Sequence, residues 1–330
     1  MLRALYLLNP DAYDKIYGEP ERADIGALVE IVAPLQTVDS VAEHPEVLAD
    51  IDVILSGWGM ATLNPAFLAA APRLQAVFYG AGSIRGIATD AAWDRGIVIT
   101  SAYAANAVPV SEYTLAQILF GLKRGWHYAL TIKREQRWIA QTPVPGAYEA
   151  TVGLVSLGMI GRLVAQRLEP FDLHTIAYDP FVSAEDAAAL GVTLVDLDTV
   201  FREADVVSLH TPKLPETLGM ITGAHFAAMK EGATFINTAR GAIVREAEMI
   251  EVLTARPDLT AVLDVTDPEP PVKESPLYTL PNVALTPHIA GSMYSECRRM
   301  GRYMVEELRR YIAGEPLKWS ITREQAALLA

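Results

Sequence analysis

The chain of 330 residues is long enough for two domains, and its formal net charge of −13 at pH 7 disfavours nucleic acid or an anionic membrane surface as a partner. Its single cysteine, Cys297, excludes an intrachain disulfide and a cysteine-rich metal site, and it fits a reducing cytoplasm. The N-terminal apolar run is too short for a signal peptide, and no run is long enough to span a membrane. We therefore expect a soluble, cytoplasmic protein without a bound metal.

Residues 1–100 alternate short apolar runs with helical patterns, which predicts a first α/β unit. Helices are expected to begin at Asn64-Pro65 and at Thr89, because Asn and Thr cap helix N-termini and Pro suits the first turn. No glycine fingerprint accompanies these runs, so this unit is not expected to bind a nucleotide. The expected strands are residues 2–8, 28–33, 53–55, 76–79 and 97–100.

A loop rich in small residues follows the fourth of these runs. Residues 80–82 (Gly-Ala-Gly) expose backbone N–H groups that could bind a carboxylate, although a flexible turn would look the same. A long helical pattern then starts at Asn106 and is expected to bridge two units. Its basic and aromatic end, residues 123–138, predicts a solvated face or a subunit contact.

The most informative stretch, residues 151–180, predicts a strand, a tight turn, a helix and a second strand. The first strand leads into a turn from Ser156 to Gly161, and the second ends at Asp179, 18 positions after Gly161. In this context a glycine-rich turn and a terminal acidic residue form a dinucleotide-binding fingerprint. The helix N-terminus would hold the pyrophosphate. Asp179 would accept hydrogen bonds from the adenosine ribose, which favours NAD over NADP.

One position departs from this fingerprint, because Ser156 stands where its first glycine would be. A serine can form the turn at negative φ or at modest strain. An ordinary capped turn between a buried strand and a helix is the alternative interpretation. The surrounding pattern and Asp179 favour the nucleotide.

Strand and helix patterns continue to alternate up to residue 288. Repeated strand–helix–strand units predict a parallel sheet covered on both faces, with ligands bound at the carboxyl ends of its strands. The expected strands are residues 205–209, 234–237, 261–265 and 283–286, and the expected helices are residues 225–229 and 246–254.

Three polar residues follow the ends of successive predicted strands: Arg240, Glu269 and His288. The planar guanidinium suits a carboxylate, and histidine moves a proton near neutral pH. A carboxylate beside the histidine would orient its ring and favour the imidazolium form. Each residue alone has an ordinary structural explanation, but their joint position around a nicotinamide site favours catalysis.

The chain resembles the D-isomer-specific 2-hydroxyacid dehydrogenases over nearly its whole length. The most specific motifs are FAAMKEGATFINTARG at 226–241, LDVTDPEP at 263–270 and LTPHIAG at 285–291, all downstream of the dinucleotide turn. Asn106 and Glu112 match the start of the family's bridging helix.

The resemblance implies an α/β protein with two doubly wound parallel-sheet domains and a cleft between them. Residues 1–101 and 293–330 would form a flavodoxin-like substrate domain, and residues 102–292 a Rossmann NAD domain. Members of this family are commonly homodimers that close on their ligand.

Roles for the polar residues also follow from the resemblance. His288 looks like the general acid that protonates the ketone oxygen, with Glu269 as its partner. Arg240 would hold the keto acid through its carboxylate and carbonyl, and Asp264 would hydrogen-bond the nicotinamide carboxamide. Further expected contacts are Gly158, Met159, Ile160 and Gly161 at the pyrophosphate, Thr211 and Pro212 on the adenosine side, Thr238 and Ala239 on the nicotinamide side, and Ala81, Gly82 and Ser83 in the substrate-carboxylate loop.

The substrate loop departs from the family pattern, because it continues Ile84-Arg85-Gly86 where an aspartate is usual. Loop conformation and substrate preference are therefore open. Arg85 at the cleft entrance would favour a dianionic substrate, whereas a solvated Arg85 would have no such effect.

We predict an NAD-dependent oxidoreductase that interconverts a small 2-keto acid, such as glyoxylate or hydroxypyruvate, and its D-2-hydroxy acid. A formate dehydrogenase-like enzyme is one alternative, but such relatives carry Gln where Glu269 stands. A non-catalytic NADH-binding regulator on the same fold is another, although the long docking tails expected of it are absent. A phosphoserine-pathway role is disfavoured, since only 42 residues follow His288.

Overall fold

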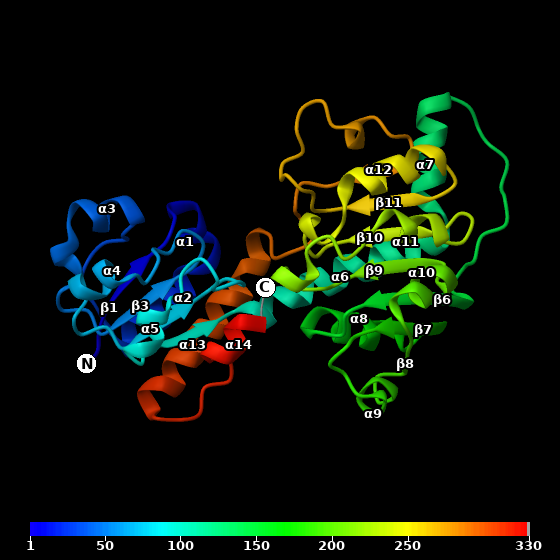
Figure 1. The fold of residues 1–330 in the computed structure, drawn as a ribbon. Coiled ribbons are helices and arrows are strands. Elements are labelled where there is room, and N and C mark those ends of the chain that lie inside the picture. The colour runs from blue at the N-terminus through cyan, green and yellow to red at the C-terminus, as the bar shows by residue number, and fades with distance from the viewer. Residues whose placement is uncertain (329–330) are drawn as a thin grey trace. The chain divides into compact units, whose positions relative to one another are not determined.

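The computed structural model describes residues 1–328, which divide into two compact units (Figure 1). The terminal unit combines residues 1–106 with the segment from Ser292 onward, and the central unit spans Ala107–Gly291. The first crossing between them lies within helix α6 (Tyr103–Leu122). Among the described residues, no helix has the length and apolar character needed to cross a membrane.

The terminal unit is built on a parallel sheet with the strand order β2-β1-β3-β4-β5. The predicted caps are confirmed: Phe67 N donates to Asn64 Oδ1 at 2.9 Å, and Ala92 N donates to Thr89 Oγ1 at 3.3 Å. The strands are β1 (Arg3–Leu7), β2 (Glu30–Ile31), β3 (Val53–Ser56), β4 (Ala76–Tyr79) and β5 (Val98–Ser101), and the helices are α1 (Pro10–Ile16), α2 (Glu19–Leu28), α3 (Val38–Glu43), α4 (Pro65–Ala70), α5 (Asp90–Asp94), α13 (Cys297–Ala313) and α14 (Arg323–Leu328).

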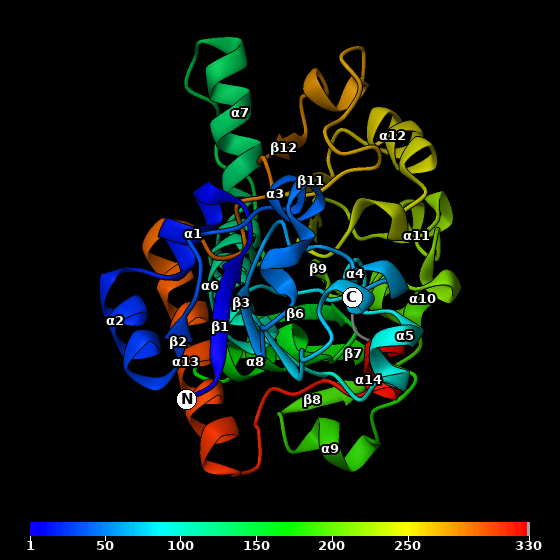
Figure 2. The ribbon, with the colours of Figure 1, turned by 90° about the vertical axis from the view of Figure 1, so that its left-hand side faces the viewer.

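Alternation along the strands of this sheet supplies two apolar faces. Leu5 and Leu7 belong to a core that includes residues of α3, α4 and α5, whereas Ala4 and Tyr6 belong to a core shared with α1, α2 and α13. Figure 2 shows these two groups of helices on opposite sides of β1 and β3. Burial on both faces explains why the strands read as nearly continuous apolar runs.

The predicted long bridging helix is interrupted. Helix α6 ends at Leu122, and α7 (Gly125–Glu135) starts after Arg124, whose φ is +51°. A Cβ atom on Gly125 would lie 2.4 Å from the Phe120 ring, so a side chain at this position would displace that ring. A helical periodicity that continues across the turn conceals the break in the sequence.

The central unit contains a parallel sheet with the strand order β12-β11-β10-β9-β6-β7-β8. The fold class predicted from the sequence, α/β with two doubly wound parallel sheets, is confirmed. The strands are β6 (Tyr148–Val155), β7 (Asp172–Tyr178), β8 (Val192–Leu194), β9 (Val206–Leu209), β10 (Thr234–Asn237), β11 (Thr260–Leu263) and β12 (Val283–Leu285), and the further helices are α8 (Met159–Leu168), α9 (Ala184–Ala188), α10 (Leu197–Glu203), α11 (Gly223–Ala228) and α12 (Glu246–Ala255).

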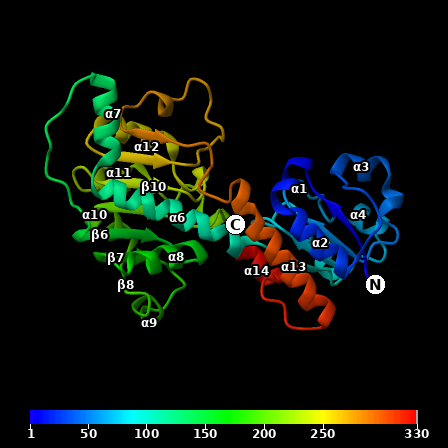
Figure 3. The same ribbon diagram turned by 180° about the vertical axis from the view of Figure 1, so that it is seen from behind.

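Helices cover both faces of this second sheet. Phe201, Phe226 and Leu253 on α10, α11 and α12 share one core with strand residues, and Ile118 and Val164 on α6 and α8 share the other. Figures 1 and 3 show these helix groups on opposite sides of the strands. Loops that leave the strands at their carboxyl ends therefore gather at one edge of the sheet.

Close packing of α13 on α1 generates a stability prediction. A Cβ atom on Gly301 would lie 2.0 Å from the backbone oxygen of Ile16, so we expect Gly301→Ala to lower the free energy of unfolding by about 1–3 kcal/mol. Gly26, exposed in α2 with no atom within 4 Å of its Cβ position, is the matched control. Gly26→Ala should raise the free energy of unfolding by roughly 0.5–1 kcal/mol. Urea unfolding of both variants checks this, and equal midpoints would contradict it.

Candidate active site

Parallel pairing brings the three candidate catalytic residues to neighbouring strand ends. Strand β10 pairs with β11, and β11 pairs with β12. Arg240 follows β10, Glu269 follows β11, and His288 follows β12. All three side chains therefore leave the same edge of the central sheet.

His288 and Glu269 form a direct pair. Nδ1 of His288 lies 2.6 Å from Oε1 of Glu269, and both side chains are substantially exposed, at 46% and 40%. With Nδ1 engaged by the carboxylate, the opposite ring nitrogen, Nε2, is the one available to exchange a proton with a bound molecule. This arrangement is typical of a carboxylate-oriented general acid.

Arg240 lies half-buried beside this pair. Its Nη1 donates to the backbone oxygen of Ala239 at 2.6 Å, and this hydrogen bond holds the guanidinium group in place. Burial lowers the pKa of Arg240, and the Glu269 carboxylate opposes that shift. The side chain stays charged, because an arginine is effectively always protonated, and its remaining N–H groups suit a planar carboxylate.

The backbone of His288 is held in an uncommon conformation by Asp264. His288 has a φ of +54°, and its N–H donates to the backbone oxygens of Asp264 and Thr286, each at 3.0 Å. The N–H groups of Ile289 and Ala290 donate to the Asp264 carboxylate at 2.9 and 2.8 Å. The 286–290 turn is thus folded around a buried carboxylate, in the manner of an anion-binding nest.

The loop that carries Glu269 is fixed at two points. A Cβ atom on Gly241 would lie 2.0 Å from the backbone carbon of Thr266, so the Arg240–Gly241 turn packs directly on this loop. The N–H of Asp267 donates to Glu246 Oε2 at 2.9 Å. Burial raises the pKa of Glu246, and the hydrogen bond from the N–H of Asp267 opposes that shift.

The predicted dinucleotide turn connects β6 to α8, and Asp179 closes it. Ser156 has a φ of +82°, the region that favours glycine. A Cβ atom on Gly161 would lie 2.1 Å from the Ser156 backbone oxygen, whereas one on Gly158 would meet nothing within 4 Å. Oδ2 of Asp179 accepts from Leu157 N at 2.7 Å and from Ser156 Oγ at 3.4 Å. The open space at Gly158 fits the approach of a pyrophosphate.

The other predicted cofactor residues lie at the ends of β9 and β10. Thr211 Oγ1 donates to Val155 O at 3.4 Å, and Thr238 Oγ1 lies 3.3 Å from Thr114 Oγ1. The sequence interpretation did not single out His210 beside them. Burial lowers the pKa of His210 to about 4, so the ring is neutral at pH 7. Within residues 1–328, neither of its ring nitrogens has a hydrogen-bond partner.

The predicted substrate-carboxylate loop lies in the terminal unit, after β4. Ser101 Oγ lies 2.9 Å from the backbone oxygen of Ala81 and 2.5 Å from that of Gly82. These hydrogen bonds tie the loop to the end of β5. The N–H of Arg85 lies 3.4 Å from Ser83 Oγ, and Arg85 Nη2 donates to the backbone oxygen of Ala327 at 3.0 Å. The departure from the family pattern at residues 84–86 is therefore accommodated by contacts within this unit.

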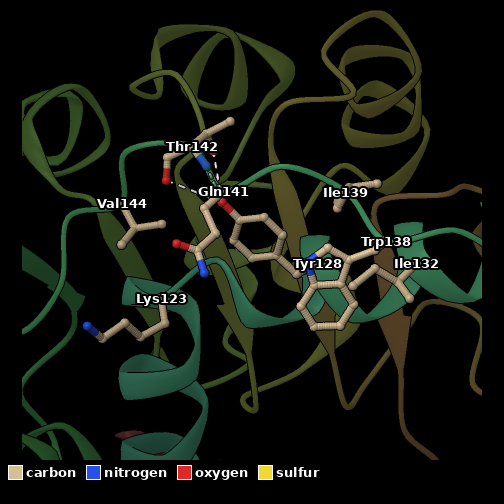
Figure 4. Close-up of a pocket in the computed structure, with 8 residues that line it drawn as sticks. All are labelled: Lys123, Tyr128, Ile132, Trp138, Ile139, Gln141, Thr142 and Val144. Carbon is tan, nitrogen blue, oxygen red and sulfur yellow. Dashed lines mark hydrogen bonds between the residues drawn. The ribbon is translucent and has the colours of Figure 1, made fainter.

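A cavity of about 300 Å³ lies elsewhere in the central unit, between α7 and the segment that follows it (Figure 4). Tyr128 points across it, and its hydroxyl accepts from Thr142 N at 2.8 Å. None of the predicted site residues lines this cavity, so it is separate from the candidate active site. Its lining residues are Lys123, Tyr128, Ile132, Trp138, Ile139, Gln141, Thr142 and Val144.

Sequence inspection did not identify the residues that position the site. Ser101 ends strand β5 and Thr286 follows β12, and a hydroxyl residue at a strand end is a usable signal. Glu246 begins an ordinary helix and offers none. Among residues 1–328, no cluster of His, Cys, Asp and Glu side chains is placed to hold a metal ion.

Known proteins similar to this chain identify its family. Residues 116–290 match the family model described as "D-isomer specific 2-hydroxyacid dehydrogenase, NAD binding domain". Relatives named D-3-phosphoglycerate dehydrogenase include one from Mycobacterium tuberculosis, 38% identical over 77% of this chain and 48% of its own length. Another, from Archaeoglobus fulgidus, is 34% identical over 76% of this chain and 47% of its own length. The chain thus spans about half the length of these relatives.

A solved structure shows the same fold. It is the NAD-complexed form of a D-isomer-specific 2-hydroxyacid dehydrogenase from Lactobacillus delbrueckii ssp. bulgaricus, with a TM-score of 0.81 and 23% identity, over 98% of this chain and all of that one. The family model covers more than half of this chain and describes an NAD-binding domain. The protein belongs to the D-isomer-specific 2-hydroxyacid dehydrogenase family, and its cofactor is NAD.

Proposed function

We propose that this protein is an NAD-dependent dehydrogenase that interconverts a small 2-keto acid and its D-2-hydroxy acid. The observation that carries the proposal is the 2.6 Å pair between His288 Nδ1 and Glu269 Oε1, with Arg240 on the adjoining strand end. A proton donor, a carboxylate that orients it and a guanidinium fork are the groups that reduction of a 2-keto acid requires.

Arg240 and His288 would have different roles in the reaction. Arg240 binds the substrate carboxylate and carbonyl, which places the carbonyl carbon and stabilises negative charge on its oxygen. His288 gives a proton from Nε2 to that oxygen and keeps its Nδ1–H bond to Glu269. In the reverse direction, the neutral ring takes the proton back. When bound, the cofactor would supply the hydride as NADH in the reducing direction and accept it as NAD⁺ in the reverse direction.

The cofactor would be held by groups already in place. The turn from Gly158 to Gly161 presents the N-terminus of α8 to the pyrophosphate, and Asp179 lies half-buried beside it with acceptor capacity for a ribose hydroxyl. Thr211 and Pro212 would line the adenosine side, and Thr238 and Ala239 the nicotinamide side. Asp264 would receive the nicotinamide carboxamide in addition to its present donors.

Glyoxylate and hydroxypyruvate are the substrates we propose. In the terminal unit, residues 57–64 after β3 and 80–89 after β4 contain one basic side chain, Arg85, which already donates to Ala327 O. A phosphate monoester would need further cations. The second candidate is a phosphorylated acid, because the relatives named above are D-3-phosphoglycerate dehydrogenases.

Substrate assays test this function. We expect NADH oxidation, followed by absorbance, with glyoxylate and hydroxypyruvate at higher kcat/KM than with 3-phosphohydroxypyruvate or with NADPH as cofactor. His288→Ala should lower kcat by about 10²–10⁴-fold, because the proton donor is lost.

Other outcomes identify the alternatives. Preference for the phosphorylated acid would reverse the substrate assignment and keep the enzyme class. NADH binding without turnover on any acid would favour the regulator, and formate-dependent NAD reduction would favour the formate dehydrogenase-like enzyme.

The positive φ of Ser156 supplies a second prediction. Ser156→Gly should raise the free energy of unfolding by about 1 kcal/mol, since glycine adopts this conformation without strain, and it should retain NADH binding. Ser295→Gly, at an exposed position without positive φ, is the control and should not stabilise the protein. Urea unfolding and NADH fluorescence titration measure both effects. A less stable Ser156→Gly variant would show that the serine side chain, rather than backbone strain, dominates at this turn.

We also propose that the protein is a homodimer, paired through α7 and the segment 136–147. Trp138 in this segment is 82% exposed beside the cavity in Figure 4, and Phe120 at the end of α6 is 42% exposed. Large exposed aromatic side chains are typical of protein interfaces.

Light scattering after size-exclusion chromatography tests the dimer. We expect a dimer for the unaltered protein and a monomer for Trp138→Asp, because a buried carboxylate would be unpaired in the interface. Leu218→Asp, 52% exposed in another part of the unit, should remain dimeric. A monomeric unaltered protein, or a Trp138→Asp variant that stays dimeric, would refute the proposed interface.

A further inference from the structure

Asp264 accepts a hydrogen bond from Thr286, which connects the 286–290 turn to helix α6. Asp264 is 2% exposed, and besides Ile289 N and Ala290 N its carboxylate is contacted by Thr286 Oγ1, at 2.6 Å from Oδ1. Thr286 Oγ1 lies in turn 2.9 Å from the hydroxyl of Tyr113 on α6. A continuous chain of hydrogen bonds therefore runs from α6 to the turn that carries His288.

The direction of these hydrogen bonds can be deduced. An ionised carboxylate only accepts, so the single hydroxyl proton of Thr286 is committed to Asp264. Thr286 must then accept the proton of Tyr113. Burial raises the pKa of the Tyr113 phenol, which keeps that proton in place at neutral pH. The Tyr113 phenol also has a side-chain hydrogen bond with Gln117.

We infer that Tyr113 is a positioning residue for His288, acting through Thr286 and Asp264. This inference rests on the proposed function of His288 as the general acid. Tyr113 anchors the Thr286 hydroxyl, Thr286 orients the Asp264 carboxylate, and Asp264 holds the N–H groups of residues 289 and 290. Those last bonds maintain the left-handed backbone of His288, on which the direction of its ring depends.

Removing Tyr113's hydroxyl should loosen the turn without unfolding it. In Tyr113→Phe, the Thr286 and backbone donors to Asp264 remain, so no buried carboxylate is left without a partner. In Thr286→Val, Asp264 loses one donor and Tyr113 loses its acceptor. Thr286→Ser keeps both hydroxyl roles and should behave as the unaltered protein.

Amide hydrogen exchange in the protein without cofactor tests the positioning directly. We expect exchange at Ile289 and Ala290, resolved by NMR, to accelerate about three- to tenfold in Tyr113→Phe. Tyr311→Phe removes another tyrosine hydroxyl bonded to a side chain, Gln75 at 3.2 Å in the terminal unit, and should leave these amides unchanged. Unchanged exchange in Tyr113→Phe would overturn the inference.

Kinetics and a double-mutant cycle test the route. In Tyr113→Phe we expect kcat to fall about three- to tenfold, because the general acid is misplaced. The double variant with Thr286→Val should be no slower than Thr286→Val alone. Additive losses would show that Tyr113 does not act through Thr286.

The two proposals fail in different ways. If the unaltered protein turns over no 2-keto acid, the proposed function fails, yet the exchange experiment still decides whether Tyr113 holds the turn. If turnover is normal and Tyr113→Phe changes neither exchange nor kcat, only the positioning inference fails.

Discussion

Parallel pairing of β10, β11 and β12 is the constraint from which the candidate active site follows. Parallel strands point the same way, so the segments after Asn237, Leu263 and Leu285 all begin at one edge of the sheet. Each connection must return across a face of the sheet, which is why helices cover both faces and the strands are apolar throughout. Arg240 and His288 are nearly fifty positions apart in the sequence, and they are thereby brought to the ends of the two strands that flank β11.

A buried carboxylate refines that placement. Asp264 would be costly to bury as an ion without compensation, and here backbone N–H groups and the Thr286 hydroxyl supply it. Satisfying the carboxylate requires residues 286–290 to fold around it, and that turn directs His288 toward Glu269. The same hydrogen bonds thus stabilise the Asp264 carboxylate, determine the conformation of residues 286–290 and orient the His288 side chain.

Both candidate ligand-binding turns contain a non-glycine residue at positive φ. Ser156 precedes α8 and His288 follows β12, and each is held by a neighbouring aspartate: Asp179 contacts the Ser156–Leu157 turn, and Asp264 contacts the 288–290 turn. Strained backbone persists where surrounding hydrogen bonds determine it. The turn at Ser156 thus forms without the first glycine of the fingerprint. Hydrogen bonds to Asp179 offset the strain of a serine at positive φ.

The amino-acid sequence by itself determined the alternation of strands and helices, the parallel fold class and the motifs around Arg240, Glu269 and His288. These follow from local periodicity and from short segments that carry their own chemistry; β4 and β10 span the predicted residues. The break at Arg124 was hidden, because the helical period continues across a turn that depends on close contact between Gly125 and Phe120. The hydrogen bonds from Tyr113 to Thr286, 173 positions apart, leave no local pattern either. Only the tertiary structure decided them, since hydroxyl partners are chosen by packing and not by sequence spacing.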